Sequence, residues 1–237
     1  MKIALIGYGR MGKAIEEIAL KRGHKIVMKI TSANAHTLTK ENLSHADVAI
    51  EFTKPETAFE HVHLCIETGL PVVCGTTGWL SRMEEVKQLC KETNGSFLYA
   101  SNFSVGVNIL FELNNRLAAL MKDRDDYEVT IEETHHIHKK DAPSGTAITL
   151  AEGIIASGKK KSYTTEADHL PGALRITSIR KDEVPGTHII RYQSENDLIE
   201  LSHEAFNRNG FAAGAVLAAE FIHHKKGIFS MKDVLHT

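Results

Sequence analysis

Hydrophobic runs alternate with amphipathic segments through about the first hundred residues of the chain. Five short, mostly apolar runs are typical of buried strands, and they cover residues 2–6, 25–30, 47–52, 71–74 and 96–100. Three segments have helical periodicity and end near a glycine, and they cover residues 13–22, 56–68 and 81–93. Strands that alternate with helices at this spacing predict βαβ units and a parallel sheet.

The pattern changes after residue 104. A helix is predicted over residues 105–121, with no short strand after it. Apolar and polar positions then alternate, which predicts a mixed or antiparallel sheet with one face open to water, at residues 127–132, 174–180, 187–193 and 197–203. The polar stretch 157–171 is expected to be a mobile loop whose lysine run is solvated, and further helices are predicted at 147–155 and 211–224.

The composition excludes several classes of protein. Hydrophobic residues make up 42% of the 237 residues and charged residues 24%, which is typical of a globular protein. Because 28 Lys and Arg nearly balance 30 Asp and Glu, we expect neither nucleic acid nor a membrane as a partner. Three cysteines are too few for a disulfide framework, so we expect reduced thiols and a cytoplasmic location. The chain has no apolar run of ~18 residues and no signal-peptide pattern.

A glycine motif separates the first predicted strand from the first predicted helix. It has the pattern G-x-G-x-x-G, formed by Gly7, Tyr8, Gly9, Arg10, Met11 and Gly12. Between a strand and a helix, such glycines allow a tight turn and a close approach of the backbone to a pyrophosphate, which the helix N-terminus attracts. The alternative is a glycine-rich turn without a ligand. The motif predicts a dinucleotide site.

The end of the second predicted strand bears on the choice of dinucleotide. The acidic residue that would hold the ribose of NAD about 20 residues after the motif is missing, and the chain has Lys29, Thr31 and Ser32 in this stretch. A cation with hydroxyls suits the 2′-phosphate of NADPH at least as well, so these residues favour NADPH over NADH.

Two further segments follow predicted strands at the sheet edge where α/β proteins bind ligands. The fourth strand is followed by Gly75, Thr76, Thr77 and Gly78, and the fifth by Ala100, Ser101, Asn102 and Phe103. Each segment alone is compatible with an ordinary turn. Together with the glycine motif, they are expected to lie at the nicotinamide and its ribose.

A dense group of titratable side chains follows the first alternating segment. It contains His135, His136 and His138, three of the 14 histidines in the chain. A metal site, a solvated loop with incidental histidines and an anion site with a proton donor are all compatible with this pattern. Neighbouring residues on an extended backbone point apart, which disfavours a metal, and we assign none. Glu132 and Glu133 are expected to lie at the surface or to orient neighbours, without chemistry of their own.

The anion-site interpretation depends on the segment after the histidines. Ser144 is predicted to cap a helix, so that the amides of Gly145 and Thr146 would face a carboxylate. Lys139 adds a positive charge, and a histidine can donate a proton near neutral pH. A carboxylate substrate beside a dinucleotide, with a proton donor available, is the outline of a reductase.

The same segment resembles the signature of the dihydrodipicolinate (4-hydroxy-tetrahydrodipicolinate) reductase family. The resemblance is carried by His135, His136, Lys139, Asp141, Ala142, Pro143, Ser144, Gly145, Thr146 and Ala147. It extends to the glycine motif, to residues 75–78, 100–108 and 180–186, to His188 and to the tail at 231–235, so it covers the chain nearly end to end. Thr31 stands where many members have an acidic residue, and the chain is shorter than many members, chiefly after the second strand and around residues 157–171.

The resemblance implies roles for the candidate residues. NADPH or NADH would be bound by the glycine motif, by residues 75–77 and by residues 100–103. His135 would donate the proton, with Lys139 as a second acid and charge partner. The substrate carboxylates would be bound by His136, Gly145 and Thr146. The substrate would be a cyclic imine with two carboxylates, reduced by hydride in the diaminopimelate route to lysine, and the resemblance also implies a homotetramer.

We therefore expect an α/β fold of two domains. Residues 1–103 plus 209–237 would form a Rossmann-type dinucleotide-binding domain. Residues 104–208 would form an inserted α+β domain, built on a mixed, largely open-faced sheet, for substrate binding and oligomerisation. The site is expected in the cleft between the domains, with closure on substrate. The alternatives are a relative of aspartate or homoserine dehydrogenase and a non-catalytic NAD(P)-sensing module.

Overall fold

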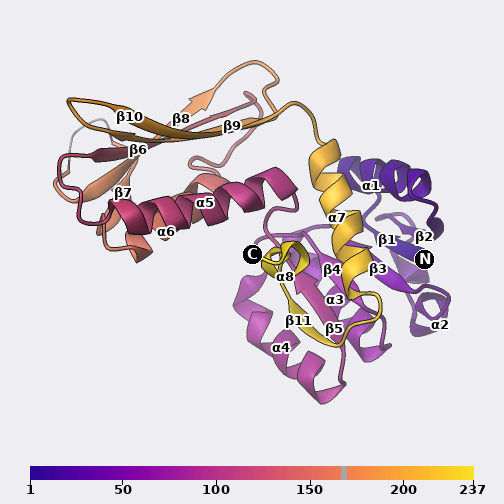
Figure 1. Cartoon of the computed structure of the whole chain (residues 1–237). Helices are drawn as coiled ribbons and strands as arrows, with labels where there is room; N and C mark the ends of the chain where they lie inside the picture. Colours follow the sequence, from indigo (N-terminus) through magenta and orange to yellow (C-terminus); the bar gives the residue numbers. More distant parts are fainter. Residues whose placement is uncertain (167–169) are drawn as a thin grey trace. The chain divides into compact units, whose positions relative to one another are not determined.

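The computed structural model describes residues 1–166 and 170–237, which form two compact units (Figure 1). Unit 1 consists of Met1–Val105 and Arg208–Thr237, and unit 2 consists of Gly106–Asn207. Each unit has its own sheet. Within the described residues, no helix combines the length and the apolar character that crossing a membrane requires.

Unit 1 is built on a parallel six-stranded sheet of order β11-β5-β4-β3-β1-β2. Its strands are β1 (Lys2–Ile6), β2 (Lys25–Ile30), β3 (Val48–Glu51), β4 (Val72–Cys74), β5 (Ser96–Tyr99) and β11 (Gly227–Phe229). The continuous apolar character of β1 and β3 follows from their central positions, where helices cover both faces. The predicted parallel α/β sheet is therefore confirmed.

Helices cover both faces of this sheet (Figure 1). One face packs against α1 (Arg10–Lys21), α7 (Asn209–Ile222) and α8 (Met231–Leu235). The other packs against α2 (Lys40–Leu43), α3 (Pro55–Glu67) and α4 (Met83–Glu92). Two short 3-10 helices, η1 (Ala35–Thr37) and η2 (Leu80–Arg82), lie in connections.

Three features of unit 1 differ from the prediction. The first helix begins at Arg10 and not at residue 13, because Gly9 is its N-cap and Gly12 lies inside its first turn. Ser81 lies in η2 and does not begin α4. The helix α2, the strand β11 and the helix α8 were not predicted, because elements of three to five residues are too short to show a periodicity.

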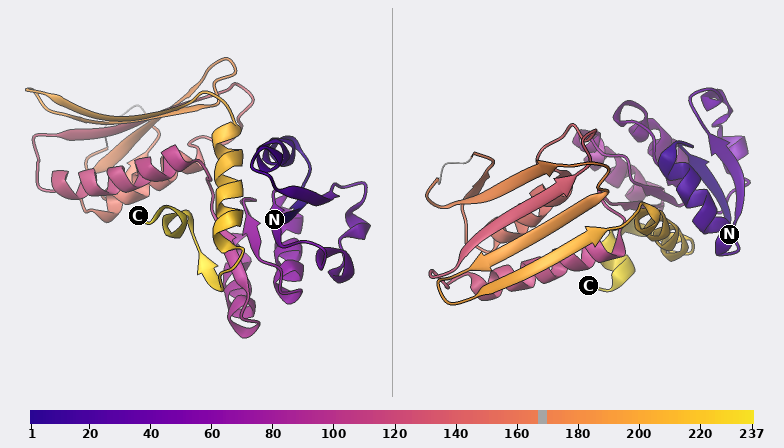
Figure 2. Two further views of the ribbon diagram at one scale, coloured as in Figure 1. Left: turned by 45° about the vertical axis from the view of Figure 1, so that its right-hand side comes forward. Right: turned by 90° about the horizontal axis from the view of Figure 1, so that it is seen from above.

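Unit 2 is built on a mixed five-stranded sheet of order β10-β9-β6-β8-β7. Its strands are β6 (Glu128–His135), β7 (Ser162–Thr164), β8 (Ala173–Arg180), β9 (Gly186–Gln193) and β10 (Leu198–Ala205). The strand β6 pairs parallel with β8 and antiparallel with β9. The helices α5 (Val105–Met121) and α6 (Gly145–Ala156) both lie on one face of the sheet (Figure 2). Within the described residues of unit 2, the mixed sheet has helices on one face alone, which agrees with the prediction.

The predicted loop at residues 157–171 is only partly a loop. Residues 162–164 form β7, which extends the sheet beside β8. Lys160 is buried, and its Nζ lies 2.6 Å from a Glu128 carboxylate oxygen. The prediction that the whole lysine run is solvated is therefore wrong at Lys160. Residues 167–169 of the predicted loop lie outside the described residues.

Candidate active site

The glycine motif turns the chain from β1 into α1. Gly7 has a φ of +97°, and a Cβ placed on it would lie 1.9 Å from the Phe52 carbonyl oxygen. A Cβ on Gly12 would lie 2.3 Å from the Gly7 carbonyl oxygen. A Cβ on Gly9, in contrast, would meet no heavy atom within 4 Å in the described part of the chain. Two glycines therefore allow tight packing, while the third leaves an open approach to the helix N-terminus, which fits a dinucleotide pyrophosphate.

Two cavities of about 410 Å³ each lie beside the motif, within the size range of ligand pockets. They share Gly9, Phe52 and Thr53 in their linings. The predicted cofactor residues that line one cavity or the other are Gly7, Tyr8, Gly9, Arg10, Met11, Gly75, Thr76 and Thr77. The structure thus brings the glycine motif and the turn after β4 to one place.

The predicted segment after β5 lies next to the turn after β4. The Ala100 amide donates to the Cys74 carbonyl oxygen at 3.3 Å, so residues 100–103 leave the sheet beside Gly75. The Phe103 ring is buried, with its centre 5.6 Å from that of Phe52. A Cβ on Gly214 of α7 would lie 1.7 Å from the Phe103 carbonyl oxygen. The Phe103 side chain therefore belongs to the hydrophobic core.

The residues considered for cofactor preference have partners within the chain. The Lys29 Nζ lies 2.6 Å from a Glu16 carboxylate oxygen and 4.8 Å from the centre of the Tyr8 ring. The Tyr8 hydroxyl donates to the same Glu16 carboxylate. Thr31 and Ser32 line the first cavity, as the sequence argument expected. Because Lys29 already forms an ion pair with Glu16, it offers less positive charge to a 2′-phosphate than the sequence suggested.

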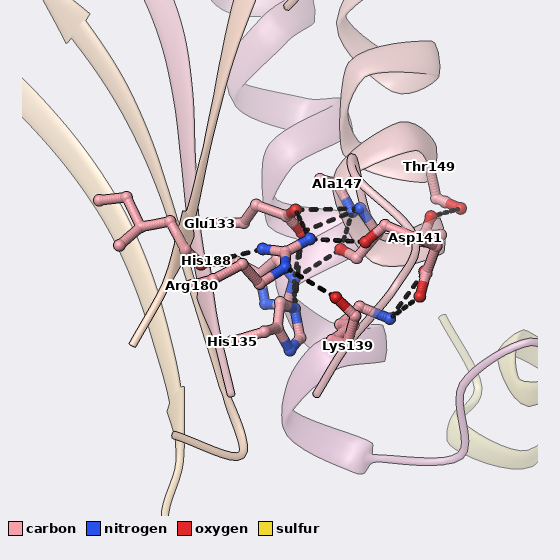
Figure 3. Close-up of polar contacts among 11 residues, drawn as sticks. Glu133, His135, Lys139, Asp141, Ala147, Thr149, Arg180 and His188 are labelled. Carbon is pink, nitrogen blue, oxygen red and sulfur yellow. Dashed lines mark hydrogen bonds and ion pairs between the residues drawn. The ribbon is translucent and has the colours of Figure 1, made fainter. Parts of the chain in front are cut away.

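In unit 2, a buried carboxylate organises the predicted catalytic segment (Figure 3). Glu133 of β6 is fully buried, and its two carboxylate oxygens accept from the Ser144 amide at 3.1 and 3.0 Å. The Arg180 Nη2 donates to Glu133 Oε1 at 3.1 Å. Burial opposes ionisation, but hydrogen bonds from His135 and Ser144 hold the pKa of this carboxyl well below its usual range. Glu133 is therefore an ionised anchor of the site and does not lie at the surface.

His135 lies between this carboxylate and a second histidine. It is the last residue of β6, and its Nε2 lies 3.5 Å from Glu133 Oε2 and 3.4 Å from the Nε2 of His188 in β9. Burial, reinforced by the neighbouring His135, lowers the pKa of His188 to about 3. A Cβ on Gly186 would lie 2.8 Å from the His135 ring, so a larger residue there would displace it. Glu133 can balance a positive charge on His135, while neutral His188 adds none.

Arg180 also fixes the loop between His135 and Ser144 (Figure 3). Its guanidinium donates to the carbonyl oxygen of Lys139 at 3.3 Å and to that of Asp141 at 2.6 Å. The Lys139 Nζ contacts both Asp141 carboxylate oxygens, at 2.9 and 2.7 Å. Burial opposes ionisation of Asp141, but the hydrogen bond from Lys139 lowers its pKa. The predicted second acid thus has a carboxylate partner that the sequence analysis did not identify.

The predicted carboxylate-binding residues lie on the same segment. Ser144 caps α6 as predicted, with its Oγ accepting from the Ala147 amide at 3.2 Å. Gly145 and Thr146 begin this helix, where the positive end of the helix dipole favours an anion. His136 is partly exposed directly after β6, and its ring centre lies 6.1 Å from that of His138.

Three buried side chains of this site could in principle bind a metal ion. Glu133, His135 and His188 place potential ligand atoms within 4.8 Å of one another, a set different from the neighbouring histidines weighed in the sequence. The Glu133 carboxylate already accepts from Arg180 and Ser144, and the guanidinium 3.1 Å away would repel a metal cation. The cluster therefore fits acid–base chemistry better than metal binding.

Several residues of both sites had no predicted role in cofactor binding, substrate binding or catalysis. In unit 2, Glu133 and His188 occupy positions on the buried face of their strands, in register with apolar residues such as Ile131 and Ile190. A polar residue on the apolar face of an alternating strand is a signal that could have identified both. In unit 1, the lining residues that were missed come after β3 and include Phe52, Thr53, Lys54, Thr57 and His61. Applying the strand-end rule to the third strand would have found the first of them.

Comparisons with known proteins cover the whole chain. Residues 1–103 match the family model described as dihydrodipicolinate reductase, N-terminus, and residues 106–235 match the one described as dihydrodipicolinate reductase, C-terminus. The 4-hydroxy-tetrahydrodipicolinate reductase of Christiangramia forsetii is 49% identical, over 99% of this chain and 98% of the relative. The enzyme of the same name from Neisseria meningitidis is 31% identical, over 99% and 97%.

Solved structures agree with these matches. The dipicolinate-bound dihydrodipicolinate reductase from Paenisporosarcina sp. TG-14 has a TM-score of 0.78 at 25% identity, with 97% of each chain covered. A probable dehydrogenase from Thermotoga maritima, at a TM-score of 0.59 and 10% identity, shares the fold alone. On the two family models and the end-to-end relatives, the chain belongs to the dihydrodipicolinate reductase family.

Proposed function

We propose that this chain reduces 4-hydroxy-tetrahydrodipicolinate to tetrahydrodipicolinate with NADPH or NADH, in the diaminopimelate route of lysine biosynthesis. The observation that carries the proposal is the buried Glu133–His135–His188 cluster at the start of α6, in a chain that matches this family from end to end. A relative of aspartate or homoserine dehydrogenase, or an NAD(P) sensor without catalysis, has no need of this cluster.

The cofactor is assigned to unit 1. When bound, the nicotinamide supplies the hydride. The open N-terminus of α1 at Gly9 would hold the pyrophosphate, and the turns after β4 and β5 would hold the nicotinamide half. The residues proposed for the nicotinamide half are Gly75, Thr76, Thr77, Ala100, Ser101, Asn102 and Phe103.

The dicarboxylate substrate is assigned to unit 2. The amides of Gly145 and Thr146 at the N-terminus of α6 would hold one carboxylate, assisted by His136. Lys139 is paired with Asp141, whose side chain is 60% exposed. A substrate carboxylate would therefore replace Asp141 as the partner of Lys139, and the ammonium group would pass from one carboxylate to another.

The proton is assigned to His135. Hydride addition to the ring carbon that becomes electrophilic as water leaves creates an electron-rich imine system, which must then gain a proton. His135 would donate this proton, with its charged form balanced by Glu133 and with Lys139 as a second acid. Neutral His188 supports the ring from the other side without competing for the proton.

We also propose a homotetramer in the cytoplasm. The face of the unit 2 sheet that carries no helix offers an association surface, and Leu198 on the edge strand β10 is 51% exposed. The cysteines of the chain, Cys65, Cys74 and Cys90, are buried free thiols, which a reducing compartment maintains. Light scattering on the purified protein would measure the subunit number, and a monomer would contradict this proposal.

The reductase activity has a direct test. Substrate generated enzymatically is mixed with the purified protein and NADPH, and cofactor oxidation is followed at the nicotinamide absorbance, with NADH in a parallel series. Turnover that depends on substrate is expected with at least one cofactor. A folded protein that turns over neither cofactor would rule the proposal out.

A further inference from the structure

A second buried carboxylate lies at the carboxyl edge of the unit 1 sheet. Glu51 is the last residue of β3 and is fully buried. Among the described residues its ion-pair partner is His61, whose Nδ1 lies 3.8 Å from Glu51 Oε1. A buried carboxylate is costly unless its oxygens are satisfied, so the groups around it are informative.

Donors from two different turns converge on this carboxylate. Oε1 accepts from the Thr53 amide at 3.0 Å and from the Thr76 hydroxyl at 3.0 Å, and the Thr53 hydroxyl also donates to it. The Thr53 amide is in addition 2.8 Å from the Thr76 Oγ1. On the other side, the Cys74 thiol donates to Oε2 at 2.9 Å. One carboxylate therefore ties the turn after β3 to the turn after β4.

The protonation states are consistent with this arrangement. Burial opposes ionisation of Glu51, but hydrogen bonds from His61, Cys74 and the two threonines lower its pKa below the ordinary value. Burial, together with the charge of Glu51, raises the pKa of the Cys74 thiol, which stays protonated and able to donate. Ionised Glu51 accepts stronger hydrogen bonds than a neutral carboxyl would, so this state holds the turns after β3 and β4 most firmly.

The turns that Glu51 joins line the cavities: the turn after β3 lines both, and the turn after β4 lines the second. Thr53 lines both cavities, Thr76 lines the second and His61 lines the first. Phe52 lies between Glu51 and Thr53, with its carbonyl oxygen against Gly7 and its ring 2.2 Å from a Cβ placed on Gly75. A shift of this short segment would therefore move the glycine motif and the turn after β4 together.

We propose that Glu51 is a positioning residue for the dinucleotide: it fixes the turns after β3 and β4 in the arrangement that binds NADPH or NADH. The inference rests on the proposed function, because that function supplies the ligand. Glu51 acts through Thr53 and Thr76, whose hydrogen bonds to it are made before the cofactor arrives. Such preorganisation raises affinity by removing the ordering cost from the binding step.

The test measures cofactor affinity without substrate. Glu51→Gln keeps the size of the side chain but removes its charge and turns one oxygen into a donor facing the Cys74 thiol. We expect the Kd for NADPH, from the change in nicotinamide fluorescence on titration, to rise about 10-fold, the effect of losing one hydrogen bond to a charged group. The kcat at saturating cofactor is expected to stay close to the native value.

Two further sets of variants separate positioning from general destabilisation. Val48→Ala opens a cavity at the opposite end of β3, where Val48 is fully buried, and should lower the unfolding temperature without changing the Kd. Thr76→Val removes the hydroxyl that bridges the two turns and should weaken binding as Glu51→Gln does, whereas Thr76→Ser should restore it. Because Glu51 and Thr76 act through one network, the double variant should lose less affinity than the sum of the single changes predicts.

The outcomes distinguish this inference from the proposed function. If the native protein binds neither NADPH nor NADH, the proposed function fails. If the native protein binds cofactor but Glu51→Gln and Thr76→Val bind with native affinity, the role of Glu51 is wrong. Equal losses of affinity in Glu51→Gln and Val48→Ala would also overturn it. If Glu51→Gln does not fold, Cys74→Ala decides the question, because Cys74 donates to Glu51 but lines neither cavity. Weaker cofactor binding by Cys74→Ala than by Cys74→Ser would support the role of Glu51, and native affinity in both would overturn it.

Discussion

Single residues of unit 2 show how a β-sheet register brings together the cluster proposed to be catalytic. In the pairing of β6 with β9, Glu133 is directly opposite His188, and in the pairing of β6 with β8, His135 is opposite Arg180. The resemblance of the local run to a family signature implied that His135 is the proton donor. The sequence could not predict these partners, because the register joins positions more than forty residues apart and depends on packing across the whole sheet.

The variant His135→Gln tests whether this residue is the proton donor. Glutamine keeps much of the shape but cannot deliver a proton, so kcat should fall by ~10²–10⁴ with a modest change in KM. Steady-state kinetics of cofactor oxidation measure both constants. His138→Gln, in the exposed part of the same loop, is the matched control and should keep the native kcat. A near-native kcat for His135→Gln would show that another group supplies the proton.

His188 makes the stability of the protein depend on pH. Its pKa is lowered to about 3 in the folded state, whereas an unfolded histidine has a value near 6.5. Between these values the unfolded chain binds a proton that the folded chain does not, so stability rises with pH across this window and is lost as pH falls. This group adds a slope of up to about 1.4 kcal/mol per pH unit. The lowered pKa of Glu133 acts in the same direction at acidic pH.

His188→Gln should therefore make the free energy of unfolding less dependent on pH. Urea denaturation of native and variant protein, compared between about pH 6 and pH 4, measures the two slopes. The variant is expected to be less stable at neutral pH, because a buried contact is lost, and to lose less stability on acidification. Parallel slopes for the two proteins would mean that His188 is charged in the folded state.

Helices and strands differ in how well the hydrophobic pattern predicted them. The long elements were predicted with small errors at their ends, since eight or more residues display a period. The missed elements, such as β7, β11 and α8, have three to five residues, and tertiary pairing rather than local pattern determines them. The predicted strand before the histidines ended too early, because pairing with β8 continues to His135.

Arg180 connects β8 to the loop proposed to be catalytic, through the carbonyl oxygens of Lys139 and Asp141. Arg180→Met keeps an apolar stem but leaves the carbonyl oxygens of Lys139 and Asp141 without this donor, and Glu133 without its cation. We expect kcat/KM to fall at least about 10-fold, and the free energy of unfolding to fall by about 1–3 kcal/mol, the cost of leaving buried polar groups unsatisfied. Enzyme assays and denaturation measure the two effects.

Two control variants separate the effect of the Arg180 guanidinium from the effects of its positive charge and of removing any arginine from unit 2. Arg180→Lys keeps the positive charge without the planar fork, so it should recover only part of the activity. Arg116→Met removes an exposed guanidinium of the same unit, paired with Glu112 on one helix at 2.8 Å, and should change little. An Arg180→Met variant that matched Arg116→Met in both measurements would contradict the role given to the loop.

The whole molecule divides the proposed reaction between its two units. Unit 1 carries the glycine motif and its cavities, and unit 2 carries the histidines and the helix start proposed to bind a carboxylate. The sequence indicated the parallel and mixed sheets because the hydrophobic period changes after residue 104. It could not show that Glu16 neutralises Lys29, because this contact follows from how a distant helix and strand pack.

The proposed reductase activity is tested most directly by following the hydride from NADPH into the product. NADPH deuterated at the transferring position of the nicotinamide is incubated with the native protein and enzymatically generated 4-hydroxy-tetrahydrodipicolinate, and the product is analysed by mass spectrometry. We expect tetrahydrodipicolinate that has gained one deuterium for each NADPH oxidised. Oxidation of NADPH without deuterium in the product, or no substrate-dependent oxidation of NADPH or NADH by the folded protein, would contradict the proposed activity.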